Sequence, residues 1–465
     1  MKKHVLKKIM AATVIASLLL TGCGAAAGEG SGEAVKETVE ETIVSETEEP
    51  AQTKEETAEE AVVEDTSETE QGTQAAEVID MTAEETKEAE NNSTYTSELV
   101  PELDIKSMDL VDNEAMAFIR SMKLGWNLGN TLDAYNDGNL SDDLSTETYW
   151  GNPKTTKELI RGVHAAGFET IRIPISWHNH VDGNYNINVQ WMARVKEIVD
   201  YACDEGMYVI INIHHDNHPE ANGIYPDAAR KEQSLKYVKT IWSQVAETFK
   251  DYDEHLVFEA MNEPRLVGHN NEWWIDNSNS DCKEAITIIN ELNQTFVDTV
   301  RATGGNNAQR YLMCPGYCAS PDGVLNAGFQ IPSDPADNRI ILSVHAYTPY
   351  SFALEYPGTS EFDHRLMNSY QDIDAFMNKL YYKYIREGIP VLIGEFGARD
   401  KSGNLEDRVR YSTYYIARAR SYGMTACWWD NGAYTGSGEL FGLMNRDNGK
   451  VVYQDILAGL VRYCE

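Results

Sequence analysis

The sequence predicts one (β/α)8 barrel, a TIM barrel of the α/β class, preceded by a signal peptide and a disordered acidic tether. Three observations lead to this prediction. Eight short apolar runs recur within residues 107–465, amphipathic helical patterns separate several of them, and nearly every run ends in polar or aromatic residues. Alternating strands and helices indicate a parallel sheet, and eight such units favour a closed barrel over an open sheet.

The predicted strands are short runs of largely aliphatic and β-branched residues, as buried parallel strands are. They cover residues 123–127, 170–174, 208–212, 256–260, 311–315, 340–344, 390–394 and 425–429. Helical spacing occurs at residues 155–166, 189–204, 228–249, 283–303, 372–387, 405–422 and 453–464, and several of these patterns stop just before a glycine. Residues 316–338 are rich in Gly, Pro and Asp, so a loop or a short turn of helix is expected there.

Residues 1–22 have the composition of an export signal. Lysines lie within residues 2–8, and the apolar stretch at 9–20 is too short for an ordinary membrane span. It ends in Leu20-Thr21-Gly22-Cys23, which resembles the lipobox of bacterial lipoproteins. The resemblance implies cleavage before Cys23, lipid on its sulfur, and an extracellular protein anchored to the cell envelope by that lipid alone. A plain secretory signal is the alternative.

Residues 23–106 differ from the rest of the chain in charge. The stretch from Cys23 to Asp104 holds 25 acidic residues and three lysines, so it carries −22 of the net charge of −35. Because it is poor in aromatic residues, it cannot bury enough apolar surface to offset the entropy of ordering, and we expect a disordered spacer. The acidic balance also argues against nucleic-acid binding, which depends on Lys and Arg.

Two glutamates stand at the ends of predicted strands that are far apart in the sequence. Glu263 lies in an Asn-Glu-Pro segment after the run 256–260, and Glu395 lies in a Gly-Glu-Phe segment after the run 390–394. The C-terminal ends of barrel strands converge on one face. Two carboxyl groups there are what cleavage of a glycosidic bond needs, one as acid and one as nucleophile or base.

Most other strand ends also carry polar or aromatic side chains. Taken singly, each is explained as a capping or core residue. Taken together they are not, since burying unpaired charge costs on the order of several kcal/mol. The set comprises Asn130, Arg172, Trp177, His214, His215, Asn262, His345, Tyr347, Trp428 and Trp429.

This constellation resembles glycoside hydrolase family 5, the large cellulase family, which has a (β/α)8 barrel and a retaining mechanism. Residues 125–134 (Gly-Trp-Asn-Leu-Gly-Asn-Thr-Leu-Asp-Ala) and 428–432 (Trp-Trp-Asp-Asn-Gly) look like its endoglucanase and xyloglucanase branch. The resemblance covers roughly residues 107–465, the whole predicted barrel.

The resemblance implies a role for each matching residue. Glu263, after Asn262, matches the general acid/base, Glu395 matches the nucleophile, and Arg172 matches the arginine that supports it. Trp429 is expected under the reacting sugar, with Trp428 in the alternative register. The remaining contacts expected around the substrate are Asn130, Trp177, His214, His215, His345 and Tyr347.

The chemistry can also be argued from the residues. Arg172 and a hydrogen bond from Tyr347 should hold Glu395 ionised, and its charge should raise the pKa of Glu263, which makes Glu263 the acid. Retention then requires the carboxyl groups about 5–5.5 Å apart. No cofactor or metal is needed. Adjacent side chains on a strand point to opposite faces, so we do not expect His214 and His215 to share one ion.

The leading hypothesis is a retaining endo-β-1,4-glucanase (cellulase) that hydrolyses internal bonds of plant cell-wall glucans. A xyloglucanase, mixed-linkage glucanase, xylanase or mannanase of the same family is the alternative, as is a transglycosylase with the same residues. From another class, the chain could be a catalytically idle surface lipoprotein that binds glycans. The presence of both glutamates argues against that role.

Some features are left open by the sequence. Trp273-Trp274 is expected to be either a subsite or helix packing, and the loop at 347–363 is a candidate wall of a cleft. The preferred glucan, the balance of endo and exo action, and the pairing of the six cysteines after Cys23 also stay open. A monomer is the default expectation.

Overall fold

The computed structural model describes residues 95–136, 144–217 and 222–465. Eight strands close into one barrel in chain order, each parallel to both of its neighbours, and this confirms the predicted fold class. The strands are β1 (Leu124–Leu128), β2 (Thr170–Ile173), β3 (Tyr208–Asn212), β4 (Leu256–Glu259), β5 (Leu312–Pro315), β6 (Ile340–His345), β7 (Val391–Phe396) and β8 (Thr425–Asp430).

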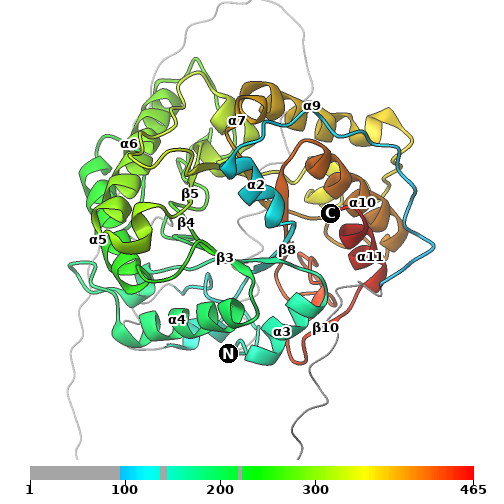
Figure 1. Ribbon diagram of the computed structural model, residues 1–465, viewed down its shortest axis with the longest axis horizontal. Helices are drawn as coiled ribbons and strands as arrows, with labels where there is room; N and C mark the ends of the chain where they lie inside the picture. Colours follow the sequence, from blue (N-terminus) through cyan, green and yellow to red (C-terminus); the bar gives the residue numbers. More distant parts are fainter. Residues whose placement is uncertain (1–94, 137–143, 218–221) are drawn as a thin grey trace, which may run out of the picture. The chain divides into compact units, whose positions relative to one another are not determined.

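The long helices form the outer ring around these strands (Figure 1). Asparagine or threonine side chains cap the N-termini of three of them, at Thr156, Asn188 and Asn279. The helices are α3 (Lys157–Ala165), α4 (Val189–Asp204), α5 (Lys231–Thr248), α6 (Ser280–Ala302), α9 (Met367–Lys383), α10 (Leu405–Ser421) and α11 (Gln454–Arg462). The predicted irregular fifth unit holds only the short helix α7 (Pro321–Leu325) and a 3-10 turn at Tyr317–Ala319.

An additional helix, α2 (Glu114–Ser121), which the strand–helix alternation did not predict, covers the N-terminal end of the barrel. Its apolar residues pack on the side chains that fill the lower interior, and Phe118 stacks on Tyr311 with ring centroids 3.7 Å apart. The opposite, C-terminal end of the barrel is therefore the end at which strand residues can meet a ligand.

Side-chain alternation on the strands decides which residues enter the barrel. On β4, Phe258 faces outward and packs on Trp242 of α5, with ring centroids 5.2 Å apart. Val257 and Glu259, one residue to either side, face the interior. This period of two is why a strand that is buried on both faces can still deliver a carboxylate to the upper interior.

The predicted end of the tether, at residue 106, differs from the structure. Residues 95–106 pack on the barrel instead of belonging to a free tether. Val100 is buried, and Leu103 donates its backbone N–H to the hydroxyl of Tyr463 at 2.9 Å. Arg462 pairs with Glu102. This stretch thus binds to the C-terminal residues Arg462 and Tyr463, a contact that the charge count alone could not show.

The predicted signal peptide, the lipid-bearing Cys23 and the tether up to residue 94 lie outside the described residues. Within the described ranges, we find no helix with the length and apolar character to cross a bilayer. The six cysteines there are all free thiols.

Candidate active site

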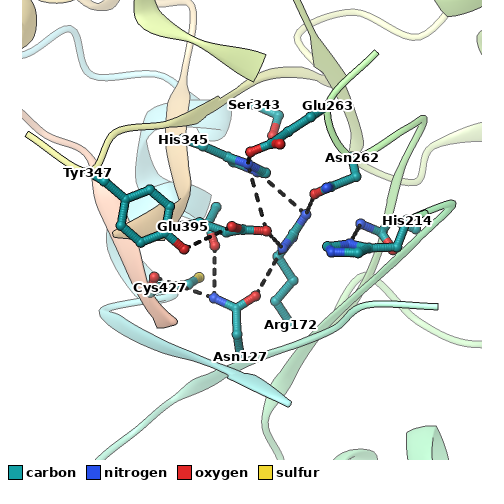
Figure 2. Close-up of polar contacts among 12 residues, drawn as sticks. Asn127, Arg172, His214, Asn262, Glu263, Ser343, His345, Tyr347, Glu395 and Cys427 are labelled. Carbon is teal, nitrogen blue, oxygen red and sulfur yellow. Dashed lines mark hydrogen bonds and ion pairs between the residues drawn. The ribbon is translucent and has the colours of Figure 1, made fainter. Parts of the chain in front are cut away.

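Arg172 on β2 stands at the centre of a polar network inside the upper barrel (Figure 2). It is fully buried and donates to four different side chains. Its Nε reaches Glu259 at 2.8 Å, its Nη1 reaches Glu395 at 2.7 Å and Asn127 at 3.0 Å, and its Nη2 reaches Asn262 at 2.8 Å. Although burial opposes its charge, the two carboxylates raise the pKa of Arg172, so it is a permanent cation.

Glu395 is held at the end of β7 by two donors of different kinds. Arg172 donates to Oε1, and the hydroxyl of Tyr347 donates to Oε2 at 3.0 Å. Gly394 precedes it because a Cβ there would lie 3.0 Å from Nε2 of His345. With both oxygens bonded to donors, the carboxylate is fixed in orientation.

His345 at the end of β6 links the two glutamates singled out by the sequence. Its Nδ1 lies 2.9 Å from Oε1 of Glu263 and 3.7 Å from Oε1 of Glu395. Burial lowers the pKa of His345, but the charge of Glu395 and hydrogen bonds with Glu259 and Glu263 raise it to about 9. The imidazole is therefore protonated at neutral pH.

The pKa of Glu263 departs from the expectation. Burial raises it, but the hydrogen bond and charge of His345, followed by the charge of Arg265, bring it below the usual value. The prediction from sequence took into account only the charge of Glu395, which would raise the pKa of Glu263. It left out the cations His345 and Arg265, which lower it. The hydrogen bond and charge of His345 therefore favour the ionised form of the Glu263 carboxyl.

The spacing of the two glutamates is short. One oxygen of Glu263, one of Glu395 and a ring nitrogen of His345 all lie within 4.8 Å of one another. Retaining glycosidases have carboxyl groups about 5–5.5 Å apart, whereas inverting enzymes need about 6.5–9.5 Å to admit a water. The geometry favours direct attack by one carboxylate.

Four residues in this network were not among the predicted site residues: Asn127, Asn212, Glu259 and Ser343. Glu259 accepts from Arg172, from Asn212 at 3.0 Å and from Ser343 at 2.5 Å. Burial raises the pKa of Glu259, but the charge of Arg172 and its hydrogen bonds lower it to about 2. The available signal was a charged residue inside a predicted buried strand.

Trp429 on β8 and His214 directly after β3 form an aromatic pair at the C-terminal end of the barrel. Their rings are parallel, with centroids 5.9 Å apart and an interplanar angle of 3°. His214 Nδ1 lies 3.2 Å from the amide nitrogen of Asn212, so it accepts and its Nε2 carries the proton. Burial lowers the pKa of His214 well below its usual value, which keeps the ring neutral. The partly exposed face of Trp429 thus adjoins a fixed neutral donor.

Two predicted aromatic contacts are wrong. Trp428 is fully buried and donates its indole N–H to the carbonyl of Phe441 at 3.0 Å. Trp177 is also buried, and its indole donates to the carbonyl of Asn212 at 2.9 Å. Register explains the choice between neighbours: Trp429 pairs with the inward-facing Asn127, whereas Trp428 pairs with Trp126 in the core.

His214 and His215 do not point to opposite faces of a strand, as the sequence predicted when it ruled out a shared ion. Both residues follow β3 instead of lying within it, and their rings meet edge to face at 4.4 Å. Ligand atoms of Asp133, His214 and His215 lie within 4.8 Å of one another. Asp133 is already engaged by the backbone N–H groups of Asn130 and Thr131. Nε2 of His215 lies 3.8 Å from Oδ2 of Asp133, the same oxygen that accepts from the backbone N–H of Asn130, so the two residues flank one carboxylate.

The loop after β6 is pinned by two cations that follow β7. Lys401 donates to the carbonyls of Ser351 at 2.6 Å and Thr359 at 3.1 Å. Arg399 donates to the carbonyl of Leu354 at 3.3 Å and to that of Gly438 in the loop after β8. The predicted wall is therefore an ordered element that contains the short helix α8 (Tyr350–Ala353).

Comparisons with known proteins agree with this geometry. The model of the family Cellulase (glycosyl hydrolase family 5) matches residues 132–435. The chain belongs to glycosyl hydrolase family 5. A solved family 5 lichenase from Caldicellulosiruptor sp. F32 is 53% identical, with a TM-score of 0.77 over 79% of this chain and 99% of that one.

Two further family 5 relatives carry endoglucanase names. Endoglucanase B of Neocallimastix patriciarum is 44% identical and covers 77% of this chain and 74% of its own. A broad-specificity endoglucanase from Ruminococcus champanellensis, solved with bound cellotriose, is 42% identical, with a TM-score of 0.70 over 76% of this chain and 100% of that one. A mutant of the lichenase was solved with cellotetraose.

Proposed function

We propose that this glycoside hydrolase cleaves internal β-1,4 bonds of plant cell-wall glucans by double displacement, with Glu395 as nucleophile and Glu263 as acid/base. Its activity is that of an endo-β-1,4-glucanase. The observation that carries the mechanism is the approach of the two carboxylates to within 4.8 Å, bridged by His345. That spacing suits a covalent intermediate and leaves too little room for an inverting water.

In the first step, Glu395 attacks the anomeric carbon while the bond to the leaving oxygen breaks. Arg172 and Tyr347 hold the attacking carboxylate in place before the reaction, so little reorganisation is required. The leaving oxygen takes a proton from Glu263. The products of this step are a glycosyl ester on Glu395 and a free reducing-side sugar chain.

The proton for this step comes from the Glu263–His345 pair. His345 holds it in the free protein, largely because the charge of Glu395 raises the pKa of the imidazole. Forming the ester removes that charge. The proton therefore moves across the 2.9 Å hydrogen bond to Glu263 as the leaving oxygen needs it. In the second step, Glu263 takes a proton from water, which then attacks the ester and releases Glu395.

The sugar that forms the ester lies on Trp429. Its flat apolar face suits the indole, and the protonated Nε2 of His214 is available for a sugar hydroxyl. We expect Asn130 and His215, which flank the carboxylate of Asp133, to contact the glucan as well. The partner of the enzyme is thus a β-1,4-linked glucan.

Mixed-linkage glucan is the second candidate substrate. The relative that is 53% identical is named a lichenase, while others are named broad-specificity endoglucanases. A xyloglucan-specific endo-β-1,4-glucanase from a metagenomic library is 39% identical. Because these names specify different glucans, we expect loops outside the catalytic centre to decide which glucans this chain accepts.

The protein acts outside the cell, anchored to the envelope by lipid on Cys23. The lipobox-like Leu20-Thr21-Gly22-Cys23 supports this placement, and so does the acidic stretch that follows it. A spacer of about 70 residues has an r.m.s. span on the order of 45 Å, enough to hold the barrel clear of the membrane. Replacing Cys23 with Ala should release the enzyme into the medium, and retention of that variant on the membrane would refute the anchor.

The activity is tested by measuring initial rates of the purified full chain on carboxymethylcellulose, mixed-linkage glucan, xyloglucan, xylan and mannan, beside Glu263→Ala and Glu395→Ala. We expect rapid loss of viscosity on β-1,4-glucans and mixed-linkage glucan, and losses on the order of 10²–10⁴-fold or more in both variants. Activity confined to mannan or xylan would replace the substrate. Glycan binding without turnover would replace the enzyme by a binding protein.

A further inference from the structure

Asp133, in the loop after β1, is a buried carboxyl group that has no role in the double displacement. Its side chain is fully buried. Its Oδ1 accepts from the backbone N–H of Thr131 at 2.7 Å, and its Oδ2 accepts from that of Asn130 at 3.1 Å. Because burying a carboxyl group is costly unless it is well hydrogen-bonded, this one must hold something in place to be worth keeping.

The turn that Asp133 closes has a backbone conformation that is uncommon outside glycine. Asn130 has a φ of 55°, which lies in the left-handed region. Asp133 binds its N–H, and the side-chain amide of Asn152 donates to its carbonyl at 3.0 Å. Such conformations persist where the surroundings enforce them, and they gather at functional sites. Asn130 is also one of the residues that we expect to contact the glucan.

Asp133 also reaches His215, a second expected contact, along two routes. Its Oδ2 lies 3.8 Å from Nε2 of His215. Its backbone carbonyl accepts from the hydroxyl of Ser176 at 2.8 Å, and that hydroxyl accepts from the backbone N–H of His215 at 3.2 Å. Ser176 is itself buried, in the loop after β2. Asp133 therefore connects the loops after β1, β2 and β3.

The same turn lies directly against the sugar platform. A Cβ on Gly129 would come within 2.8 Å of the Trp429 indole, so the backbone of the turn packs on that ring. The carbonyl of Gly129 accepts from the hydroxyl of Thr131 at 3.1 Å, and Thr131 is one of the two residues whose N–H groups bind Asp133. A shift of the turn would therefore change the surface that meets the sugar on Trp429.

The charge of the Asp133 carboxyl depends on groups from three other elements. These groups are the rings of His214 and His215 after β3, the carboxylate of Glu395 on β7, and the guanidinium of Arg446 after β8. Burial raises the pKa of Asp133 to about 7 against its backbone hydrogen bonds, and the charge of Glu395 adds to the increase. Burial lowers the pKa of His215 to about 3 and also lowers that of His214. Asp133 is thus the member of this group that changes charge near neutral pH.

We infer that Asp133 is a positioning residue, which holds Asn130 and His215 where they meet the glucan and holds them more firmly in its ionised form. The inference rests on the proposed function and deepens it. An ionised carboxylate accepts from backbone N–H groups more strongly than a carboxylic acid does, so the turn and the groups bound to it are fixed more firmly. The affinity for glucan should therefore rise as the pH increases through about 7.

The test measures cellotetraose binding on either side of pH 7 by isothermal titration calorimetry. The parent is the full-length Glu263→Gln variant, which slows turnover but keeps the charge of Glu395 that acts on Asp133. We expect the parent to bind about threefold to tenfold more tightly above this pH than below it. Adding Asp133→Asn keeps the size of the side chain but not its charge. Binding should then be about tenfold weaker at the higher pH, and the change near pH 7 should be lost.

Asp182→Asn, added to the same parent, is the matched control. Asp182 also accepts from two backbone N–H groups, those of Asn184 at 2.8 Å and Asn186 at 2.9 Å. It is exposed, and the hydrogen bonds described for its side chain stay within residues 182–186. This variant should bind cellotetraose as the parent does at every pH.

Ser176→Ala tests the link to His215 without altering the carboxyl group. It removes the hydroxyl that joins the Asp133 carbonyl to the N–H of His215, so binding should weaken about threefold while the change near pH 7 persists. The parent and this variant can be measured even if Asp133→Asn does not fold. Equal affinity on both sides of pH 7 in the parent, or an unchanged pH dependence in Asp133→Asn, would overturn the inference. A parent that bound no cellotetraose, with an unmodified enzyme that cleaved no glucan, would instead contradict the proposed function.

Discussion

The catalytic centre and the loop between β4 and α6 both place side chains next to Glu263, but they hold them by different means. In the centre, Arg172, Glu259 and Asn262 come from strand ends and bond to one another through side chains that are buried. On the loop, Tyr317 donates to the backbone carbonyl of Asn271, and the indoles of Trp273 and Trp274 are left exposed. The centre is therefore fixed through buried side chains, whereas the loop is fixed through its backbone and leaves its aromatic side chains at the surface.

The largest loss of stability is expected when a charge is removed from the buried network. Glu259→Gln should lower the free energy of unfolding by about 3–5 kcal/mol, because Arg172 loses one of its two carboxylate partners in a fully buried site. Urea unfolding measures this change. As a loop counterpart, Glu272→Gln removes a partly exposed partner of Arg265 and should lower the free energy of unfolding by about 1 kcal/mol or less. Similar losses in the two variants would contradict the contrast.

The adjacent residues Trp428 and Trp429 separate stability from function within one strand. Trp428→Ala should destabilise by about 3–5 kcal/mol, because it empties a fully buried site. Trp429→Ala should leave the melting temperature nearly unchanged and lower kcat/KM on cellopentaose roughly 10- to 100-fold through loss of the sugar platform. Thermal unfolding and steady-state kinetics check both variants. The reverse pattern would show that the assigned register is wrong.

His345 makes the buried centre sensitive to pH. Its pKa is raised from 6.5 to about 9, so the folded protein binds this proton more tightly than the unfolded chain. The resulting stability is fully present below pH 6.5 and is lost as the pH rises through about 9. His345→Asn should remove this part of the pH dependence of the unfolding free energy between those values. An unchanged slope would show that another group is responsible.

A modest effect is expected at the loop after β6. Lys401→Met removes two hydrogen bonds to the carbonyls of Ser351 and Thr359, and should lower the unfolding free energy by about 1–3 kcal/mol. Hydrolysis of the small substrate 2,4-dinitrophenyl β-cellobioside should change much less than cleavage of carboxymethylcellulose. We expect only the polymer to need the wall that the loop after β6 forms. Limited proteolysis near residue 356, compared with the unmodified protein, measures the loosening of the loop.

Much of the fold could be predicted from sequence, because the spacing of apolar residues and the glycines that end helices are local features. Eight apolar runs and the glycines after the helices give the barrel, with boundaries correct to within a few residues. The helix α2 was missed since its role is to close the barrel end, a contact that no local pattern contains. Residues 95–106 were assigned to the tether because charge outweighs a few apolar residues in a composition count.

At the site, the sequence located residues that stand at strand ends, such as Glu263, Glu395 and Arg172. It missed Glu259, because a charge inside an apolar run has no local partner to explain it. It could not choose between Trp428 and Trp429, since that choice depends on pairing with β1. It also placed the pKa shift of Glu263 in the wrong direction, because Arg265 and His345 act across space.

The proposed mechanism depends most on direct attack by Glu395, and the stereochemistry of the first product tests this step. We would follow cellotetraose hydrolysis by proton NMR from the first minutes and observe the newly formed reducing end before mutarotation. We expect the β-anomer to appear first, because two displacements restore the configuration. Initial formation of the α-anomer would mean a single displacement by water, and would contradict the roles assigned to Glu395 and Glu263.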